Sequence, residues 1–188
     1  MTLSDGDVIG FSGKGLVSDA INVGTWALPR WGLSHIGIVS TYKGIPMLFE
    51  STSVCSDSVC AITGEPISGV QAHKLDELIR RPGRVWQYRP VKPLNGGERL
   101  ALKFCLLHAL GQPYDYVGAA RSGGFLLRLI EGALRQPEVT KLFCSELVAL
   151  ALNSIGKTRI ANVSAQSPNS LGRYLQRHGV YKRPTQLK

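Results

Sequence analysis

Two periodicities of hydrophobic positions divide the chain into predicted strands and predicted helices. Alternating or short continuous apolar segments predict strands over residues 8–11, 34–40, 46–51 and 84–89. Apolar positions three or four residues apart predict helices over residues 16–27, 75–81, 97–110, 123–135, 142–153 and 171–177. Most strands precede most helices, and residues 53–69 are typical of a loop of small residues. The pattern therefore predicts an α+β fold in which a small sheet packs against helices.

The second and third predicted strands form a hairpin whose register follows from its turn. If residues 43–44 are a two-residue turn, Gly37 faces Glu50 across the hairpin. His35 and Gly37 share a face of the sheet, so Glu50 lies diagonally from His35, at a Cβ distance of roughly 7–8 Å. A slip of one residue would turn Glu50 to the opposite face. In the predicted register a carboxylate reaches the His35 imidazole across Gly37.

The length and composition suit one globular domain, which we expect to span residues 1–188. Hydrophobic residues make up 44% of the chain and charged residues 19%, unlike a disordered protein. No apolar run reaches the roughly 18 residues of a membrane-spanning helix. The first seven residues are acidic and polar, unlike a secretory signal. We therefore expect synthesis in a cytoplasm, and delivery to a cell wall or into a virion by other components.

Basic residues are concentrated after residue 60. The net charge is +9, and residues 61–188 carry nineteen Lys and Arg against eight Asp and Glu. Such a surface favours an anionic partner such as a cell-wall polymer, and it equally suits a solvated face that aids solubility. The sequence has no helix-turn-helix, zinc-finger or RNP pattern, so we expect no specific nucleic-acid partner.

The four cysteines predict reduced thiols rather than disulfides, because the chain has no secretory signal. Cys55, Cys60 and His73 together suggest zinc, but their spacing is loose and no fourth ligand stands out. We expect free thiols there, and neither a metal nor a cofactor.

The main chemical signal is a cysteine at the start of an apolar helix together with a histidine on a strand. Cys144 lies in Phe-Cys-Ser-Glu-Leu-Val and His35 in Ser-His-Ile-Gly-Ile-Val. A thiol ionises more readily beside an imidazole and at a helix N-terminus. Either the helix begins just before Cys144, or Thr140 caps it and the N-terminal effect is smaller. Each residue taken singly is explained more simply by ordinary packing. Cys55, Cys60 and Cys105 lack such a setting, so we expect Cys144 to be the one thiol with a lowered pKa and the first to be alkylated.

These segments, in this order, resemble the permuted branch of the NlpC/p60 superfamily, which includes YiiX-like proteins and the lecithin–retinol acyltransferase group. Papain-like proteins ordinarily have Cys before His, whereas here His35 precedes Cys144. Further matches extend over nearly the whole chain, at residues 6–9, 111–115 and 167–168. The resemblance implies a circularly permuted papain-like fold with a small antiparallel sheet. It also implies that Cys144 is the nucleophile, His35 the general base and Glu50 the polar third residue.

Some roles in this comparison stay open. Thr52 and Asp57 are the nearest substitutes for Glu50, because the third position varies in the family. The backbone N–H of Cys144 is one expected oxyanion-hole donor, and the sequence does not identify the second. Tyr114 and Asp115 either line the cleft or start a helix.

Three functions remain compatible with the sequence. The first is a cysteine peptidase or amidase that acts through a thioester on bacterial cell-wall peptides. The second is a lipid esterase or acyltransferase, for which the apolar face of residues 123–135 would contact a membrane surface. The third is a non-catalytic structural part, for example of a bacteriophage particle with its own assembly partners.

Overall fold

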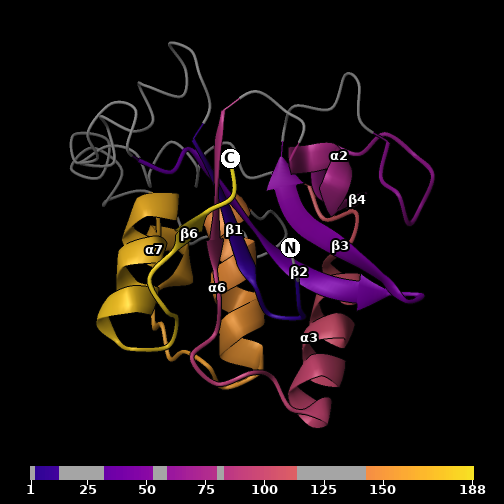
Figure 1. Ribbon diagram of the computed structural model, residues 1–188. Coiled ribbons are helices and arrows are strands. Elements are labelled where there is room, and N and C mark those ends of the chain that lie inside the picture. Colours follow the sequence, from indigo (N-terminus) through magenta and orange to yellow (C-terminus); the bar gives the residue numbers. More distant parts are fainter. Residues whose placement is uncertain (1–2, 13–31, 53–58, 80–82, 114–142) are drawn as a thin grey trace, which may run out of the picture.

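One six-stranded antiparallel sheet and four α-helices make up the part of the chain that the computed structural model describes, residues 3–12, 32–52, 59–79, 83–113 and 143–188 (Figure 1). The strands are β1 (Val8–Ser12), β2 (His35–Tyr42), β3 (Ile45–Thr52), β4 (Gly69–Lys74), β5 (Arg84–Tyr88) and β6 (Thr185–Gln186). The helices are α2 (Leu75–Ile79), α3 (Gly96–Ala109), α6 (Cys144–Ser154) and α7 (Pro168–Arg177), and a 3₁₀ turn, η1, covers Val163–Ala165. The strand order is β4-β3-β2-β1-β5-β6, and the predicted α+β class is confirmed.

The β2–β3 hairpin has the predicted register. Ile38 pairs with Phe49, and the two turn residues, Lys43 and Gly44, have φ angles of 49° and 80°. Positive φ at both positions is what a type I′ turn requires, and this turn matches the twist of the flanking strands. A Cβ atom at Gly37 would lie 2.8 Å from the carbonyl oxygen of Phe49. Glycine at position 37 therefore lets β2 and β3 approach closely next to Glu50.

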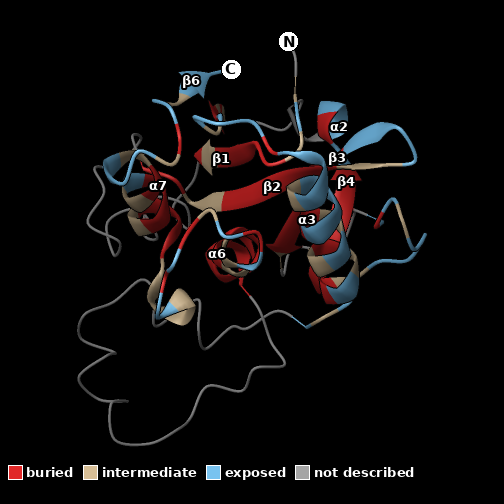
Figure 2. Cartoon of the chain, turned by 90° about the horizontal axis from the view of Figure 1, so that it is seen from below, coloured by how far each residue is buried: buried red, intermediate tan, exposed pale blue. Residues whose placement is uncertain are grey.

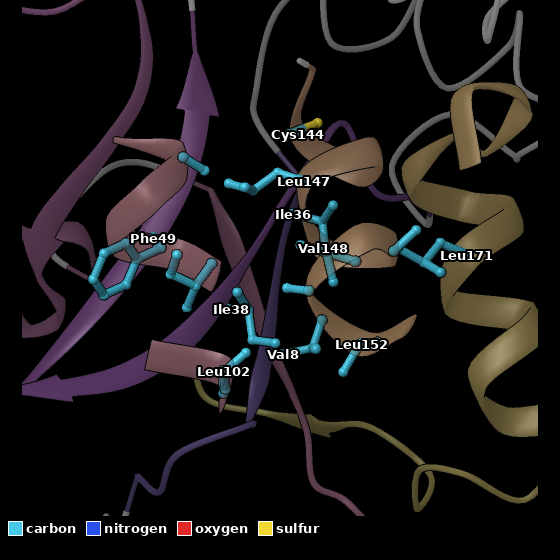
Figure 3. Packing of buried hydrophobic residues seen from close by; sticks show 14 of the residues in the cluster. Val8, Ile36, Ile38, Phe49, Leu102, Cys144, Leu147, Val148, Leu152 and Leu171 are labelled. Carbon is cyan, nitrogen blue, oxygen red and sulfur yellow. The ribbon is translucent and has the colours of Figure 1, made fainter. Parts of the chain in front are cut away.

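Helices α3, α6 and α7 lie on one face of the sheet, and their sheet-facing sides are buried (Figure 2). Helix α6 is buried along most of its length because residues 147–152 are all apolar. Its Leu147, Val148 and Leu152 pack toward Ile36 and Ile38 of β2 (Figure 3). This packing fixes the first turn of α6 relative to β2.

The opposite face of the sheet carries a smaller apolar cluster together with buried polar residues. Ile9, Val39, Leu48 and Val85 pack there against Leu75 of α2. Strand alternation puts three polar residues of β3 and β4 on this same face, each at most 3% exposed: Glu50, Gln71 and His73. Buried polar side chains in such a setting require partners.

Strand β4 was not predicted, although Val70 and Ala72 alternate with Gln71 and His73 as in a short strand; all four are buried, so its polar positions do not face solvent. Helix α7 begins at Pro168, earlier than predicted, since Ser167 and Ser170 form a capping box and proline suits the first helical position. The predicted helices over 16–27 and 123–135 lie outside the described residues. No helix within the described ranges is long and apolar enough to span a bilayer.

Candidate functional site

Cys144 is the first residue of α6, and Phe143 is the N-cap. This agrees with the first of the two predicted helix starts, whereas Thr140 lies outside the described residues. The phenyl side chain of Phe143 cannot accept a hydrogen bond, so it does not cap the N–H groups of the first turn. These N–H groups and the helix dipole favour negative charge at the Cys144 sulfur and at an oxygen bound beside it.

The two residues after Cys144 attach the start of α6 to the η1 segment. The Ser145 hydroxyl donates a hydrogen bond of 2.6 Å to the Gln166 carbonyl oxygen. The Ser164 hydroxyl donates to the buried carboxylate of Glu146. These two contacts fix the residues directly after Cys144, and so they restrain the position of Cys144 itself.

His35 and Glu50 are in contact, as the hairpin register predicts. The His35 Nε2 and Glu50 Oε2 atoms lie 2.6 Å apart. The Glu50 side chain is 1% exposed and that of His35 is 25% exposed, so the imidazole is the solvent-accessible part of the pair. The His35 ring also packs against Phe11 on β1, with ring centroids 5.9 Å apart. The imidazole is therefore held both by a charged partner and by an aromatic neighbour.

The charges around His35 favour its protonated form. Burial alone lowers the pKa of His35, but the negative charges of Cys144 and Glu50, and hydrogen bonds to both side chains, outweigh burial and raise the pKa to about 10. Cys144 and Glu50 thus both favour the charged form of the His35 imidazole, although the three residues come from three separate elements. At neutral pH this site holds a proton on the imidazole, between a sulfur and a carboxylate.

The remaining residues singled out in the sequence divide into two groups. Thr52, a substitute considered for Glu50, pairs with Gly69 at the end of β3. Asp57, Tyr114 and Asp115 lie outside the described residues.

Two residues that support the site were not predicted in that role. Asn169 of α7 accepts a hydrogen bond of 2.7 Å from the Leu33 N–H and donates one of 3.0 Å to the Leu33 carbonyl oxygen. It braces the backbone two residues before His35. His73 is the second, and its Nε2 lies 3.6 Å from the other carboxylate oxygen of Glu50. Its role could have been predicted only from a fourth strand that pairs with the hairpin and places a histidine diagonally from Glu50.

The thiols differ in their surroundings, and one expectation is corrected here. Burial raises the pKa of Cys60, but backbone hydrogen bonds, including the Ala72 N–H at 3.5 Å, outweigh it and lower the pKa. The expectation that only one thiol of the chain has a lowered pKa is therefore wrong for Cys60. It is, however, completely buried, whereas Cys105 is partly exposed and Cys55 lies outside the described residues.

We expect iodoacetamide at about pH 6.5 to alkylate Cys144 before Cys60 and Cys105. Cys144 has an imidazolium beside it, Cys60 is shielded, and Cys105 has no such partner among the described residues. Mass mapping of the labelled peptides over time measures the order, and Cys144→Ala controls for assignment. Labelling of Cys60 or Cys105 at the same rate as Cys144 would contradict the expectation.

A metal centre is not supported by the described residues. They contain no group of three or more His, Cys, Asp or Glu side chains that could hold a metal ion. Cys60 and His73, which the sequence suggested as zinc ligands, instead contact the Ala72 N–H and Glu50.

The described elements define an α+β protein whose six-stranded antiparallel sheet carries helices α3, α6 and α7 on one face. This fold is shared with the metalloprotein YiiX of Escherichia coli O157:H7, a DUF1105 protein known from a crystal structure. The two are 17% identical and align with a TM-score of 0.57 over 98% of this chain and 96% of that chain. A likeness at this identity concerns the fold alone. No protein-family model and no curated protein sequence matches the chain.

Proposed function

We propose that this protein is a cysteine hydrolase of permuted papain-like type in the NlpC/p60 superfamily, with Cys144 as nucleophile, His35 as acid and base, and Glu50 as orienting residue. The observation that carries the proposal is the His35 imidazole, which lies 2.6 Å from a buried carboxylate and whose pKa is raised by that carboxylate and by the first side chain of α6, Cys144. This arrangement has the three roles of a catalytic triad, filled by residues from two strands and a helix.

The proposed reaction proceeds in two acyl-transfer steps. The Cys144 sulfur attacks the carbonyl carbon, and the oxyanion that forms accepts a hydrogen bond from the Cys144 N–H. The His35 imidazolium gives its proton to the leaving nitrogen, the carbon–nitrogen bond breaks and a thioester remains. Water then attacks the thioester while His35 accepts a proton, which releases the carboxylic acid and restores the thiol. Glu50 holds the imidazole and stabilises its charge throughout.

The proposed substrates are peptide or amide bonds of bacterial cell-wall material. The resemblance of the sequence to the superfamily and the net charge of +9 support this choice, because wall polymers are anionic. Under this proposal the protein reaches the wall through other components, such as a phage particle.

Incubation with purified peptidoglycan tests the proposal. The wild-type protein should release new amino termini, detected by mass spectrometry, and Cys144→Ala should lower the rate by about 10³-fold or more. Cys105→Ala is the matched control, since Cys105 is a partly exposed thiol on α3 that has no part in the proposed triad, and it should retain activity. Equal results for the wild type and Cys144→Ala would reject the wall hydrolase.

A lipid esterase or acyltransferase is the second candidate, and one surface favours it. On α3, Leu100 and Phe104 are 62% and 73% exposed, four residues apart, with Arg99 and Lys103 beside them. Exposed apolar side chains flanked by cations are typical of contact with an anionic membrane surface. The predicted membrane contact at residues 123–135 lies outside the described residues.

Mixed anionic liposomes separate the two candidates. Release of fatty acid that depends on Cys144, together with flotation that Phe104→Ala weakens, would favour the lipid substrate. If neither substrate is turned over and Cys144 is also unreactive, the remaining candidate is a papain-like structural part of a larger particle.

A further inference from the structure

We infer that His73 is a positioning residue of this site, which holds the second carboxylate oxygen of Glu50 so that the first stays directed at His35. The inference rests on the proposed function and adds a fourth residue to it. The Glu50 Oε1 atom lies 3.6 Å from His73 Nε2, and the Glu50 Oε2 atom lies 2.6 Å from His35 Nε2. The carboxylate therefore lies between two imidazoles.

The register of the sheet explains both contacts of Glu50, because each histidine is a diagonal neighbour of Glu50 on an adjacent strand. Across β3 and β4, Leu48 is opposite His73 and Glu50 is opposite Gln71, so Glu50 and His73 are diagonal neighbours on one face. The same diagonal relation joins Glu50 to His35 across β2 and β3. His35, Glu50 and His73 thus form an oblique row over three adjacent strands, with the partly exposed His35 at one end.

A buried carboxylate needs two restraints to keep one orientation. Glu50 is 1% exposed and His73 is 3% exposed, so little water is available to solvate the second oxygen. A group that contacts one oxygen alone leaves rotation of the carboxylate free, whereas contacts on both oxygens fix it. The distance of 3.6 Å lies within the range of an ion pair, which requires a protonated His73, and beyond that of a full hydrogen bond. His73 therefore restrains Glu50 less tightly than His35 does.

Packing alone does not explain a histidine at this position. Directly opposite His73 stands Leu48, which belongs to the apolar cluster with Val39 and Leu75. An apolar side chain would suit these neighbours better than an imidazole, whose burial costs free energy unless it has a polar partner. Glu50 is such a partner.

The test compares His73→Gln, which keeps an N–H donor near the place of Nε2, with His73→Leu, which removes it. We expect His73→Leu to lower kcat by about 10-fold with KM little changed, and His73→Gln to recover most of the loss. In a Glu50→Gln background His73→Leu should cause less than about a 2-fold further loss, because it acts through Glu50. The exposed His108→Gln is the matched control.

The opposite result is an equal loss from His73→Leu in both backgrounds, which would assign His73 a packing role and overturn the inference. If His73→Leu does not fold, as judged by circular dichroism, His73→Asn replaces it. Asparagine puts its amide near the place of Nδ1, so it should lose activity where glutamine keeps it. Equal activity of these two variants would also overturn the inference.

The alkylation rate of Cys144 distinguishes this inference from the proposed function, since it requires no knowledge of the substrate. We expect the rate to fall in His35→Gln, Glu50→Gln and His73→Leu. A rate that responds to His35 and Glu50 but not to His73 rejects the role of His73 alone. A rate that responds to none of them rejects the proposed site and the inference together.

Discussion

Glu50→Gln is expected to lower turnover at pH 7 by about 10²- to 10⁴-fold and to move the alkaline limb of the pH profile to lower pH. The amide keeps the shape of the side chain but removes its charge. In the wild type, turnover should persist until the imidazolium loses its proton near pH 10, the value to which the pKa of His35 is raised. Glu50 is one cause of that rise, so its loss lowers the pKa toward the ordinary value of about 6.5.

The same shift affects folding stability with a defined sign. Because the pKa of His35 is raised in the folded protein, its contribution to stability is complete below the unfolded value of about 6.5 and is lost as pH rises through about 10. Urea unfolding at several pH values should show this loss in the wild type and a smaller one in Glu50→Gln.

The pH profile needs a control that changes a glutamate elsewhere. Glu65 is exposed in the loop before β4, so Glu65→Gln should keep the wild-type profile. An alkaline limb at the same pH in the wild type and in Glu50→Gln, or one moved upward by the substitution, would contradict the assigned role of Glu50.

Phe49→Ala is expected to lower the free energy of unfolding by about 3–5 kcal/mol. Phe49 is completely buried, pairs with Ile38 on one side and Ala72 on the other, and packs in the core under α3 and α6 (Figure 3). Truncation removes apolar contacts and leaves a cavity that the sheet backbone cannot close.

The matched control is the same substitution on the surface. Phe104 is 73% exposed on α3, so Phe104→Ala should change the free energy of unfolding by no more than about 0.5 kcal/mol. Urea denaturation of both variants, with circular dichroism as the readout, measures the difference. Similar values for the two would show that β3 is not anchored through Phe49.

The hairpin was predictable because its information is local. A two-residue turn with Gly44 in second place fixes the pairing of every residue up to Glu50, so the contact between His35 and Glu50 follows from counting. A helix that contains Cys144 also follows from the apolar positions of this segment, whereas its first residue did not, since the sequence left Thr140 as an alternative cap. These parts of the site depend on short-range spacing.

The supporting residues were not predictable because their partners are distant. Asn169 binds the backbone of Leu33 across 136 residues of sequence, and nothing near either residue indicates the other. His73 was considered only with the cysteines, because its strand lacks an exposed polar face. A buried polar residue has the same appearance in a sequence as an exposed one, and only the packed sheet distinguishes them.

The link between Asn169 and Leu33 also has a consequence for biosynthesis. During translation the β2–β3 hairpin is synthesised first, α6 with Cys144 much later, and α7, which braces Leu33, last of the three. The histidine–glutamate pair is therefore made well before Cys144 and before the helix that braces Leu33. Under the proposed function, a nascent chain that ends before residue 168 would lack a fully supported site.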